Sequence, residues 1–184
     1  YSELEYLTCD GNQYVDTGIY SDENTEAVSR CQFTYDGAIY GIYESTTQSC
    51  FSGYCSASGG YWRSGDQYIS LKPTANYYHH FKLNASYVEY DGTQTAFPST
   101  VGSYTSPNTI YLCATNNNNT ATNWFIGKVC YIGIWKNGSL IASYVPCINP
   151  QGIVGFYDIV GQTFYRSQGS KDFTATSVAM YSPI

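Results

Sequence analysis

The chain has 184 residues, a formal net charge of −6 and a sequence pI near 4.6. Its eight Lys and Arg residues are scattered singly, which excludes the phosphate-tracking basic stripe of a nucleic-acid-binding protein and argues against an anionic membrane as partner. No apolar run approaches the ~18 residues that span a bilayer, so we expect no membrane insertion.

The composition is typical of a protein that works outside the cell. Charged residues make up 12% of the chain, about half of the roughly 25% found in ordinary globular proteins, whereas Tyr alone contributes 21 residues. Such a neutral, hydroxyl-rich and aromatic composition resembles a recognition surface more than a cytosolic enzyme. We therefore expect a secreted, cell-surface or virion-surface protein. Because the chain begins at Tyr1, we expect it to be processed or excised from a longer polypeptide.

Short apolar runs separated by turn dipeptides predict β-strands along the whole chain. In chain order, the predicted strands are residues 4–7, 13–17, 27–35, 38–43, 77–84, 87–90, 109–114, 124–135 and 140–145. Residues 48–58 are predicted to form a hairpin, while the glycine-rich run 59–65 and the asparagine-rich run 115–123 are predicted to be loops. No segment repeats apolar residues at helical spacing, so we expect almost no helix.

The strongest hairpin signal is Asn137-Gly138, because both residues tolerate the positive φ that a tight primed turn requires. A two-residue turn predicts that Trp135 faces Leu140, that Ile134 faces Ile141 and that Tyr131 faces Tyr144. Side chains alternate across a strand, so the hairpin should present two faces. The predicted core face contains Ile132, Ile134, Ile141 and Val145; the opposite face contains Tyr131, Trp135, Leu140 and Tyr144.

Three stretches carry a family resemblance. The run Y-I-G-I-W-K-N-G-S-L-I-A-S-Y-V-P-C, with the following G-I-V-G-F-Y-D-I-V-G-Q-T-F-Y and G-S-K-D-F, resembles the C-terminal half of concanavalin A-like, laminin G-like jelly-roll domains. The opening L-E-Y-L-T-C-D-G-N-Q-Y-V-D-T-G-I resembles their first strand pair, in the version found in phage structural proteins and surface proteins of gut bacteria. The resemblance implies one domain over residues 1–184, with an all-β jelly-roll sandwich of two antiparallel sheets whose terminal regions lie close together.

Seven cysteines in so neutral a chain favour an oxidising compartment, although the odd number leaves at least one unpaired. Cys50 with Cys55, across a small loop, and Cys113 with Cys130, on successive predicted strands, are candidate pairs, and the sequence leaves the connectivity open. Cys9 with Cys31 is a weaker candidate pair, and the resemblance implies no partner for Cys147.

The sequence offers little for catalysis or for a metal. Adjacent strand residues point to opposite faces, so His79 and His80 cannot converge on one ion, and a histidine bonded to the backbone is the better interpretation. Glycosidases of this fold use two carboxylates in an E-x-D-x-E run, which is missing here. A calcium ion at the rim would need several carboxylates; Asp16, Asp22 and Glu23 are close in sequence, but we interpret them as turn residues. We expect no enzyme activity and no cofactor.

Two segments favour ligand recognition, because sugars are bound by aromatic faces together with amides and hydroxyls. Tyr61 and Trp62 lie in the glycine-rich run, and Asn116 and Asn118 precede Trp124. These five residues are the predicted ligand contacts of a non-catalytic module that binds a glycan or another cell-surface ligand. The competing interpretation is that both tryptophans cap the sandwich. The alternative function is a subunit of a fibre or capsid decoration, which contacts neighbouring copies through tyrosine-rich faces.

Overall fold

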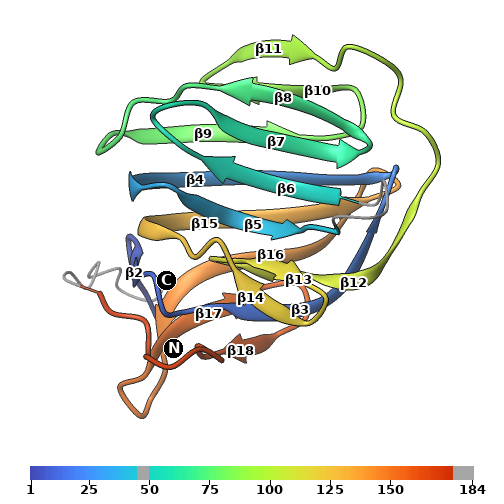
Figure 1. The fold of residues 1–184 in the computed structure, drawn as a ribbon. Coiled ribbons are helices and arrows are strands. Elements are labelled where there is room, and N and C mark those ends of the chain that lie inside the picture. Colours follow the sequence, from blue (N-terminus) through green and yellow to red (C-terminus); the bar gives the residue numbers. More distant parts are fainter. Residues whose placement is uncertain (45–49, 176–184) are drawn as a thin grey trace.

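A computed structural model describes residues 1–44 and 50–175, and within them it contains strands and turns but no helix. The strands form two sheets that lie against each other as two layers (Figure 1). The pairing is antiparallel, apart from a single parallel contact between Asn116 and Ile42. The prediction of an all-β sandwich of two antiparallel sheets is therefore confirmed.

The ten-stranded sheet has the order β11-β10-β9-β4-β15-β16-β17-β18, with β1 beside β16 and β2 beside β15. Its strands are β1 (Ser2–Glu3), β2 (Leu7–Asp10), β4 (Thr25–Tyr35), β9 (Tyr78–Leu83), β10 (Tyr87–Tyr90), β11 (Thr93–Ala96), β15 (Ile126–Lys136), β16 (Ser139–Ile148), β17 (Val154–Asp158) and β18 (Thr163–Tyr165). The N-terminal segment also bridges the C-terminal one between Thr8 and Thr174, as expected for terminal regions that lie close together.

The eight-stranded sheet has the order β14-β13-β5-β6-β7-β8, and β12 joins it by pairing with both β3 and β5. Its strands are β3 (Val15–Asp22), β5 (Gly37–Ile42), β6 (Cys50–Cys55), β7 (Gly60–Gly65), β8 (Gln67–Leu71), β12 (Thr105–Leu112), β13 (Thr115–Asn117) and β14 (Thr120–Thr122). One face of this sheet covers the ten-stranded sheet; β5 is buried throughout, whereas β7 and β8 expose Tyr61 and Tyr68.

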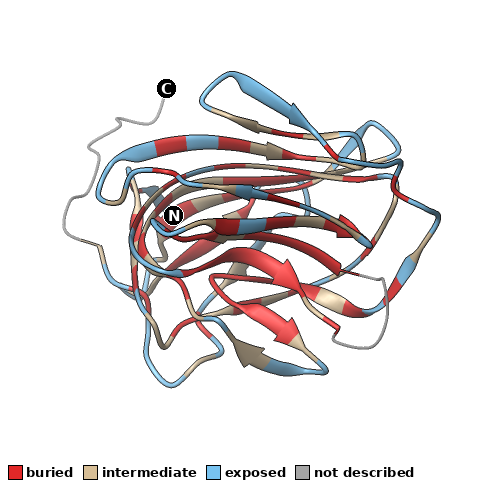
Figure 2. Cartoon of the chain, turned by 45° about the horizontal axis from the view of Figure 1, so that its top comes forward, coloured by how far each residue is buried: buried red, intermediate tan, exposed pale blue. Residues whose placement is uncertain are grey.

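The core lies between the two layers, where the central strands are mostly buried and the connecting loops are exposed (Figure 2). Its centre is aromatic. The indole of Trp62 in β7 stacks on Phe81 in β9, with ring centroids 4.4 Å apart, and so joins the two sheets. Phe81 in turn stacks on Tyr90, and Tyr40 approaches Trp62 edge-on. Large rings bury more apolar surface than aliphatic side chains, so this cluster contributes strongly to stability.

The Asn137-Gly138 hairpin forms, with φ angles of 52° and 75° at the two turn residues. Trp135 faces Leu140 as predicted, but a register shift follows, so that Ile134 faces Ala142 and Ile132 faces Tyr144. A bulge of this kind inserts one extra residue and reverses the faces beyond it. Tyr144 is consequently buried in the core, whereas Ile141 and Val145 are only partly buried. The predicted register was wrong beyond the bulge.

Two segments predicted as loops are strands. Residues 60–65 form β7 in the middle of a sheet, and residues 115–122 form the short β13–β14 hairpin. The predicted hairpin over residues 48–58 is instead the single strand β6, although residues 48 and 49 lie outside the described residues. Gly and Ser are weak strand formers, so the sequence pattern concealed these strands.

All seven cysteines are free thiols. Cys50 and Cys55 stand at the two ends of one strand, ~16 Å apart at the usual rise per residue, which is far beyond the reach of a disulfide. Because every cysteine is free, the candidate pairs Cys50 with Cys55, Cys113 with Cys130 and Cys9 with Cys31 are wrong as disulfides.

The buried thiols instead contact each other across the sandwich. Cys9 lies beside Cys113, and Cys31 lies beside Cys55. Desolvation by burial, with these contacts, holds the pKa of Cys9 and that of Cys31 well above the ordinary range of a thiol. Both side chains thus behave as small apolar core residues.

Within residues 1–44 and 50–175, no helix is long and apolar enough to cross a membrane.

Candidate functional site

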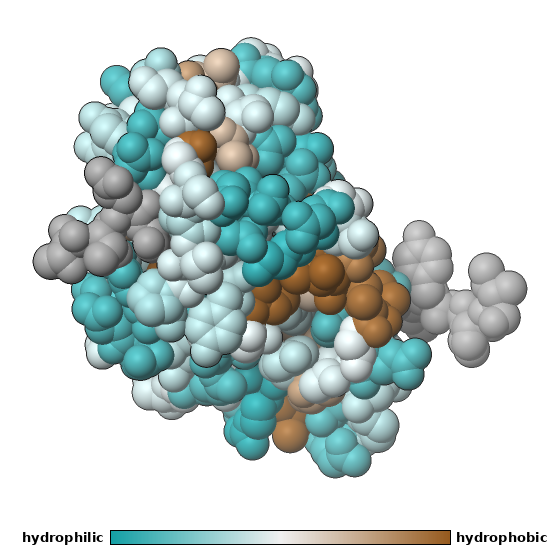
Figure 3. Space-filling model, turned by 90° about the vertical axis from the view of Figure 1, so that its right-hand side faces the viewer, coloured by the Kyte–Doolittle hydropathy of each residue, from teal (hydrophilic) through white to brown (hydrophobic). Residues whose placement is uncertain are grey.

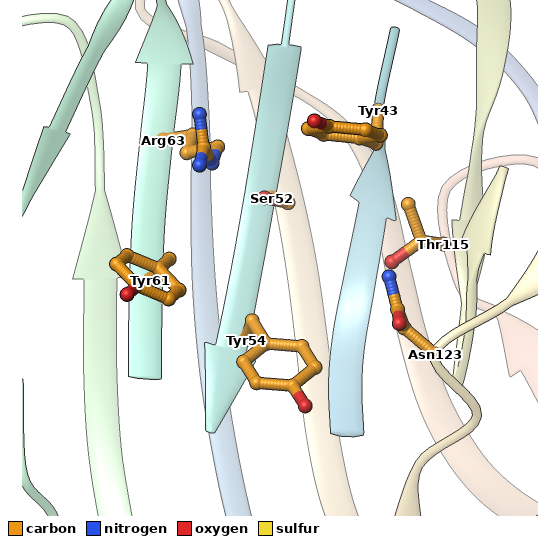
Figure 4. Close-up of a pocket in the computed structure, with 7 residues that line it drawn as sticks. All are labelled: Tyr43, Ser52, Tyr54, Tyr61, Arg63, Thr115 and Asn123. Atoms are coloured by element: carbon orange, nitrogen blue, oxygen red, sulfur yellow. The ribbon is translucent and has the colours of Figure 1, made fainter. Parts of the chain in front are cut away.

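A hollow of about 270 Å³ lies on the outer face of the eight-stranded sheet. It is lined by residues of β6, β7 and β13 and by residues that follow β5 and β14, namely Tyr43, Ser52, Tyr54, Tyr61, Arg63, Thr115 and Asn123. Figure 4 shows Tyr61 and Arg63 along one side, Thr115 and Asn123 along the other, and Ser52 between them. The volume is somewhat below the roughly 300–1,000 Å³ of pockets that enclose a drug-sized ligand, so it suits one sugar ring or the tip of a longer ligand.

Strand alternation places these side chains on one face. In β7 the side chain of Trp62 is fully buried, while its neighbours Tyr61 and Arg63 point outward. In β6 Phe51 is fully buried, and Ser52, which lines the bottom of the hollow, is only 5% exposed. The lining is thus fixed by the register of paired strands rather than by loop conformation.

The floor of the hollow is low because two small residues meet at its centre. Gly41 in β5 pairs with Ser52 in β6, and Ser52 pairs with Arg63 in β7. A Cβ atom added at Gly41 would come within 2.7 Å of the Ser52 Cβ. A larger residue at either position would fill the floor, so the pairing of Gly41 with Ser52 creates the space between the surrounding rings.

The hollow combines aromatic faces with polar groups. The guanidinium carbon of Arg63 lies 5.5 Å from the ring centroid of Tyr43, 5.6 Å from that of Tyr61 and 5.4 Å from that of Tyr68. Desolvation by burial raises the pKa of Tyr54, so its hydroxyl stays a neutral hydrogen-bond donor at physiological pH. Together these groups offer apolar rings for stacking, one cation, and hydroxyl and amide groups for hydrogen bonding.

The predicted ligand residues divide between this hollow and the interior. Tyr61 lines the hollow with 46% of its surface exposed. Trp62 must be corrected, because its fully buried indole packs on Phe81 and offers no surface to a ligand. Asn116 must also be corrected: it is fully buried, donates to the Thr109 carbonyl and accepts from the Asn119 amide, and so shapes the β13–β14 turn.

Asn118 and Trp124 remain predicted ligand contacts. Asn118 is exposed in the β13–β14 turn, with a φ of 50°. Trp124 is half-buried and packs edge-on against Tyr14, next to Asn123 of the hollow.

Most residues that line the hollow are not among the ligand contacts predicted from the sequence. Its missed residues are Tyr43, Ser52, Tyr54, Arg63, Thr115 and Asn123. A signal was present, because Ser52 with Tyr54 and Tyr61 with Arg63 each have the two-residue spacing of one strand face. The glycine and serine content of both segments masked that spacing.

The carboxylates and histidines lie elsewhere. Among its described lining residues the hollow has no Asp, Glu or His, so it lacks the paired carboxylates that a glycosidase needs. The ring nitrogens of His79 lie 2.7 Å from an Asp91 carboxylate oxygen and 2.8 Å from the Thr74 carbonyl oxygen. Both nitrogens have protein partners, and the neighbouring His80 is exposed on the opposite face, as predicted.

The acids considered for calcium are engaged within the protein. Asp16 accepts from the Gly18 amide, Asp22 pairs with Lys136, and Glu23 accepts from Ser103 and from the Tyr104 amide. No group of three or more His, Cys, Asp or Glu residues that could hold a metal ion occurs in the described part of the chain.

Comparisons with known proteins establish the fold. No family model matches the sequence, and no curated protein matches it. Among solved structures, domains LG4-5 of the mouse laminin alpha1 chain match with a TM-score of 0.52 and 12% sequence identity. The alignment covers 75% of this chain and 44% of the laminin fragment, so the chain spans less than half of that structure. The two-sheet arrangement of this chain is a laminin G-like β-sandwich.

Proposed function

We propose that this chain acts as one non-catalytic recognition module of an exported or virion-surface protein, and that it binds a glycan through the hollow on the eight-stranded sheet. The observation that carries the proposal is the lining itself: Tyr43, Tyr54 and Tyr61 surround a floor made by a small residue, with Thr115 and Asn123 at the edge. Sugars present apolar ring faces and polar hydroxyls at once, and aromatic rings with flanking amides and hydroxyls match both.

The resemblance of the sequence to phage structural proteins and gut-bacterial surface proteins supports an extracellular setting, as does the low content of charged residues. The absence of carboxylates from the described lining of the hollow supports binding without catalysis. Asn118 and Trp124 would extend the contact beyond the hollow when the ligand is longer than one sugar.

Removal of the Tyr61 ring should reduce glycan binding at least tenfold, which corresponds to about 1.4 kcal/mol. The ring is 46% exposed and lines the hollow, so Tyr61→Ala removes a stacking surface without opening the core. The measurement is a glycan array with the purified domain, followed by titration of the best glycan with both proteins.

Tyr35 supplies the matched control, because its ring is 67% exposed and lies outside the hollow. Tyr35→Ala should bind as the unmodified chain does. Equal loss in the two variants, or no binding by the unmodified chain across the array, would contradict the proposal.

The alternative is a structural subunit that assembles with neighbouring copies. Exposed apolar side chains support it: Leu140, Ile159 and Val160 are each at least 40% exposed, and Figure 3 shows hydrophobic residues gathered on an otherwise mostly hydrophilic face. A fibre subunit should bury on the order of 1,000 Å² or more between copies. Sedimentation of the purified chain at micromolar concentration decides between the two, because the recognition module is expected to stay monomeric and a fibre subunit to associate.

A further inference from the structure

The cation in the hollow has no anionic partner. Within the described residues the Arg63 side chain forms no ion pair and donates no hydrogen bond, and its guanidinium lies beside the rings of Tyr43, Tyr61 and Tyr68. By contrast, four of the eight Lys and Arg residues, among them Lys82 and Lys136, pair with carboxylates. The donors of Arg63 therefore remain available to a ligand.

The surroundings of Arg63 favour an anion. Its guanidinium is half-buried among aromatic rings, which attract a cation through their faces but leave its net charge uncompensated. No acid lines the described part of the hollow, and Glu44, which follows Tyr43 in the chain, is buried and accepts a hydrogen bond from Asn108. A charge-assisted hydrogen bond to a ligand anion would be roughly twice as strong as a neutral one.

The charge of the whole chain limits which anion fits. With a net charge of −6, the protein repels a polyanion at long range, and the hollow contains a single cationic side chain. One planar guanidinium matches one carboxylate in a bidentate pair. The arrangement therefore favours a ligand with one carboxylate at its tip over a heavily sulfated chain.

We propose that the hollow selects a sugar residue that carries a carboxylate, a sialic acid or a hexuronic acid at the end of a glycan. The carboxylate pairs with Arg63, the ring face packs on Tyr61 or Tyr43, and the hydroxyls meet the exposed Asn123. This assignment rests on the proposed glycan-binding function and adds the chemical class of the ligand.

The test compares probes that differ only at the carboxylate. The purified domain is titrated with sialyllactose and with digalacturonic acid, each beside its carboxyl-reduced form, at low and at physiological salt. We expect at least one acid to bind ten or more times more tightly than its reduced form. Arg63→Gln should lower the affinity for that acid to the level of the reduced probe and lower the affinity for the reduced probe much less, because only the acid loses a charge-assisted pair.

Arg30 provides a matched control, because its guanidinium carbon also lies 5.4 Å from a tyrosine ring, that of Tyr78, but on the other sheet. Arg30→Gln should not change the affinity for either probe. The melting temperature and circular dichroism of Arg63→Gln should match those of the unmodified chain, which separates lost binding from lost folding.

The contrary results distinguish a failure of the carboxylate assignment from a failure of the glycan site itself. Equal affinity for acid and reduced probes, with binding still lost in Tyr61→Ala, would overturn the carboxylate assignment and leave the glycan site standing. Tighter binding of a heparin oligosaccharide than of the acids would also overturn it. No binding of the acids, of the reduced probes or of any glycan on the array would overturn both proposals.

Discussion

Replacing Trp62 with alanine should lower the free energy of unfolding by about 3–5 kcal/mol, the usual range for removing a buried large aromatic side chain. The indole is fully buried and stacks on Phe81 across the two sheets, so its loss leaves a cavity in the middle of the sandwich. Globular domains have a total stability of about 5–15 kcal/mol, so this one substitution should bring the chain near its unfolding threshold. Urea denaturation followed by circular dichroism measures the change.

Tyr61 is the natural comparison, because it is the neighbour of Trp62 in β7 but points into the hollow. Tyr61→Ala should lower stability by less than about 1 kcal/mol while it reduces glycan binding at least tenfold. An unfolding midpoint for Trp62→Ala equal to that of the unmodified chain would contradict the burial described here.

Replacing Gly127 with alanine should also destabilise the protein strongly, by about 3 kcal/mol, at the upper end of the usual cost of overpacking. Gly127 lies in β15, paired with Cys9 of β2 on one side and with Phe33 of β4 on the other. An added Cβ atom would lie 2.1 Å from the Gln32 carbonyl oxygen and 2.8 Å from the Phe33 Cα. Both are backbone atoms of the central sheet, so relief requires that β4 move away from β15.

Gly102 is the matched control, because a Cβ atom added there does not meet the backbone of another strand. It is exposed, and an added Cβ atom would have no heavy atom within 4 Å. Gly102→Ala should change stability by no more than about 0.5 kcal/mol. Thermal unfolding of the two variants side by side measures the difference, and similar melting temperatures would show that β4 can shift at little cost.

The fold could be predicted from the sequence because its signals are local and repeated. Turn dipeptides such as Asp36-Gly37 and Asn137-Gly138 separate apolar runs: the first marks the bend between β4 and β5, and the second marks the turn between β15 and β16. The register of the last hairpin could be predicted only as far as Trp135 and Leu140. Beyond them the register depends on a bulge, which is set by how the hairpin packs on the rest of the sandwich. Counting residues outward from the turn cannot reveal it.

The candidate site was predicted less well, for a related reason. The glycine-rich composition of residues 59–65 predicts a loop, in which the neighbouring side chains of Tyr61 and Trp62 can reach the same ligand. In the strand they occupy opposite faces, so only one of them reaches the hollow. Arg63 is a single cation in a neutral segment, and by itself such a residue predicts no binding site. Its importance depends on Tyr43 and Tyr68, which only the sheet brings beside it.

For the cysteines, distance along the sequence does not predict distance in the structure. Cys50 and Cys55 are close in sequence, yet a strand holds them far apart, whereas Cys9 and Cys113 are distant in sequence and meet in the core. The contacts that matter for such residues are set by which strands face each other across the sandwich.

Paired strands hold the lining of the hollow in place, and this rigidity limits how tightly a single copy can hold its ligand. A rigid platform loses little conformational entropy when a glycan docks, but it also cannot close over the glycan as a mobile loop would. One copy that contacts one sugar residue should therefore bind weakly and release quickly. Firm attachment would come from many copies displayed together on a particle or cell surface, where each rebinding event is intramolecular and avidity replaces affinity.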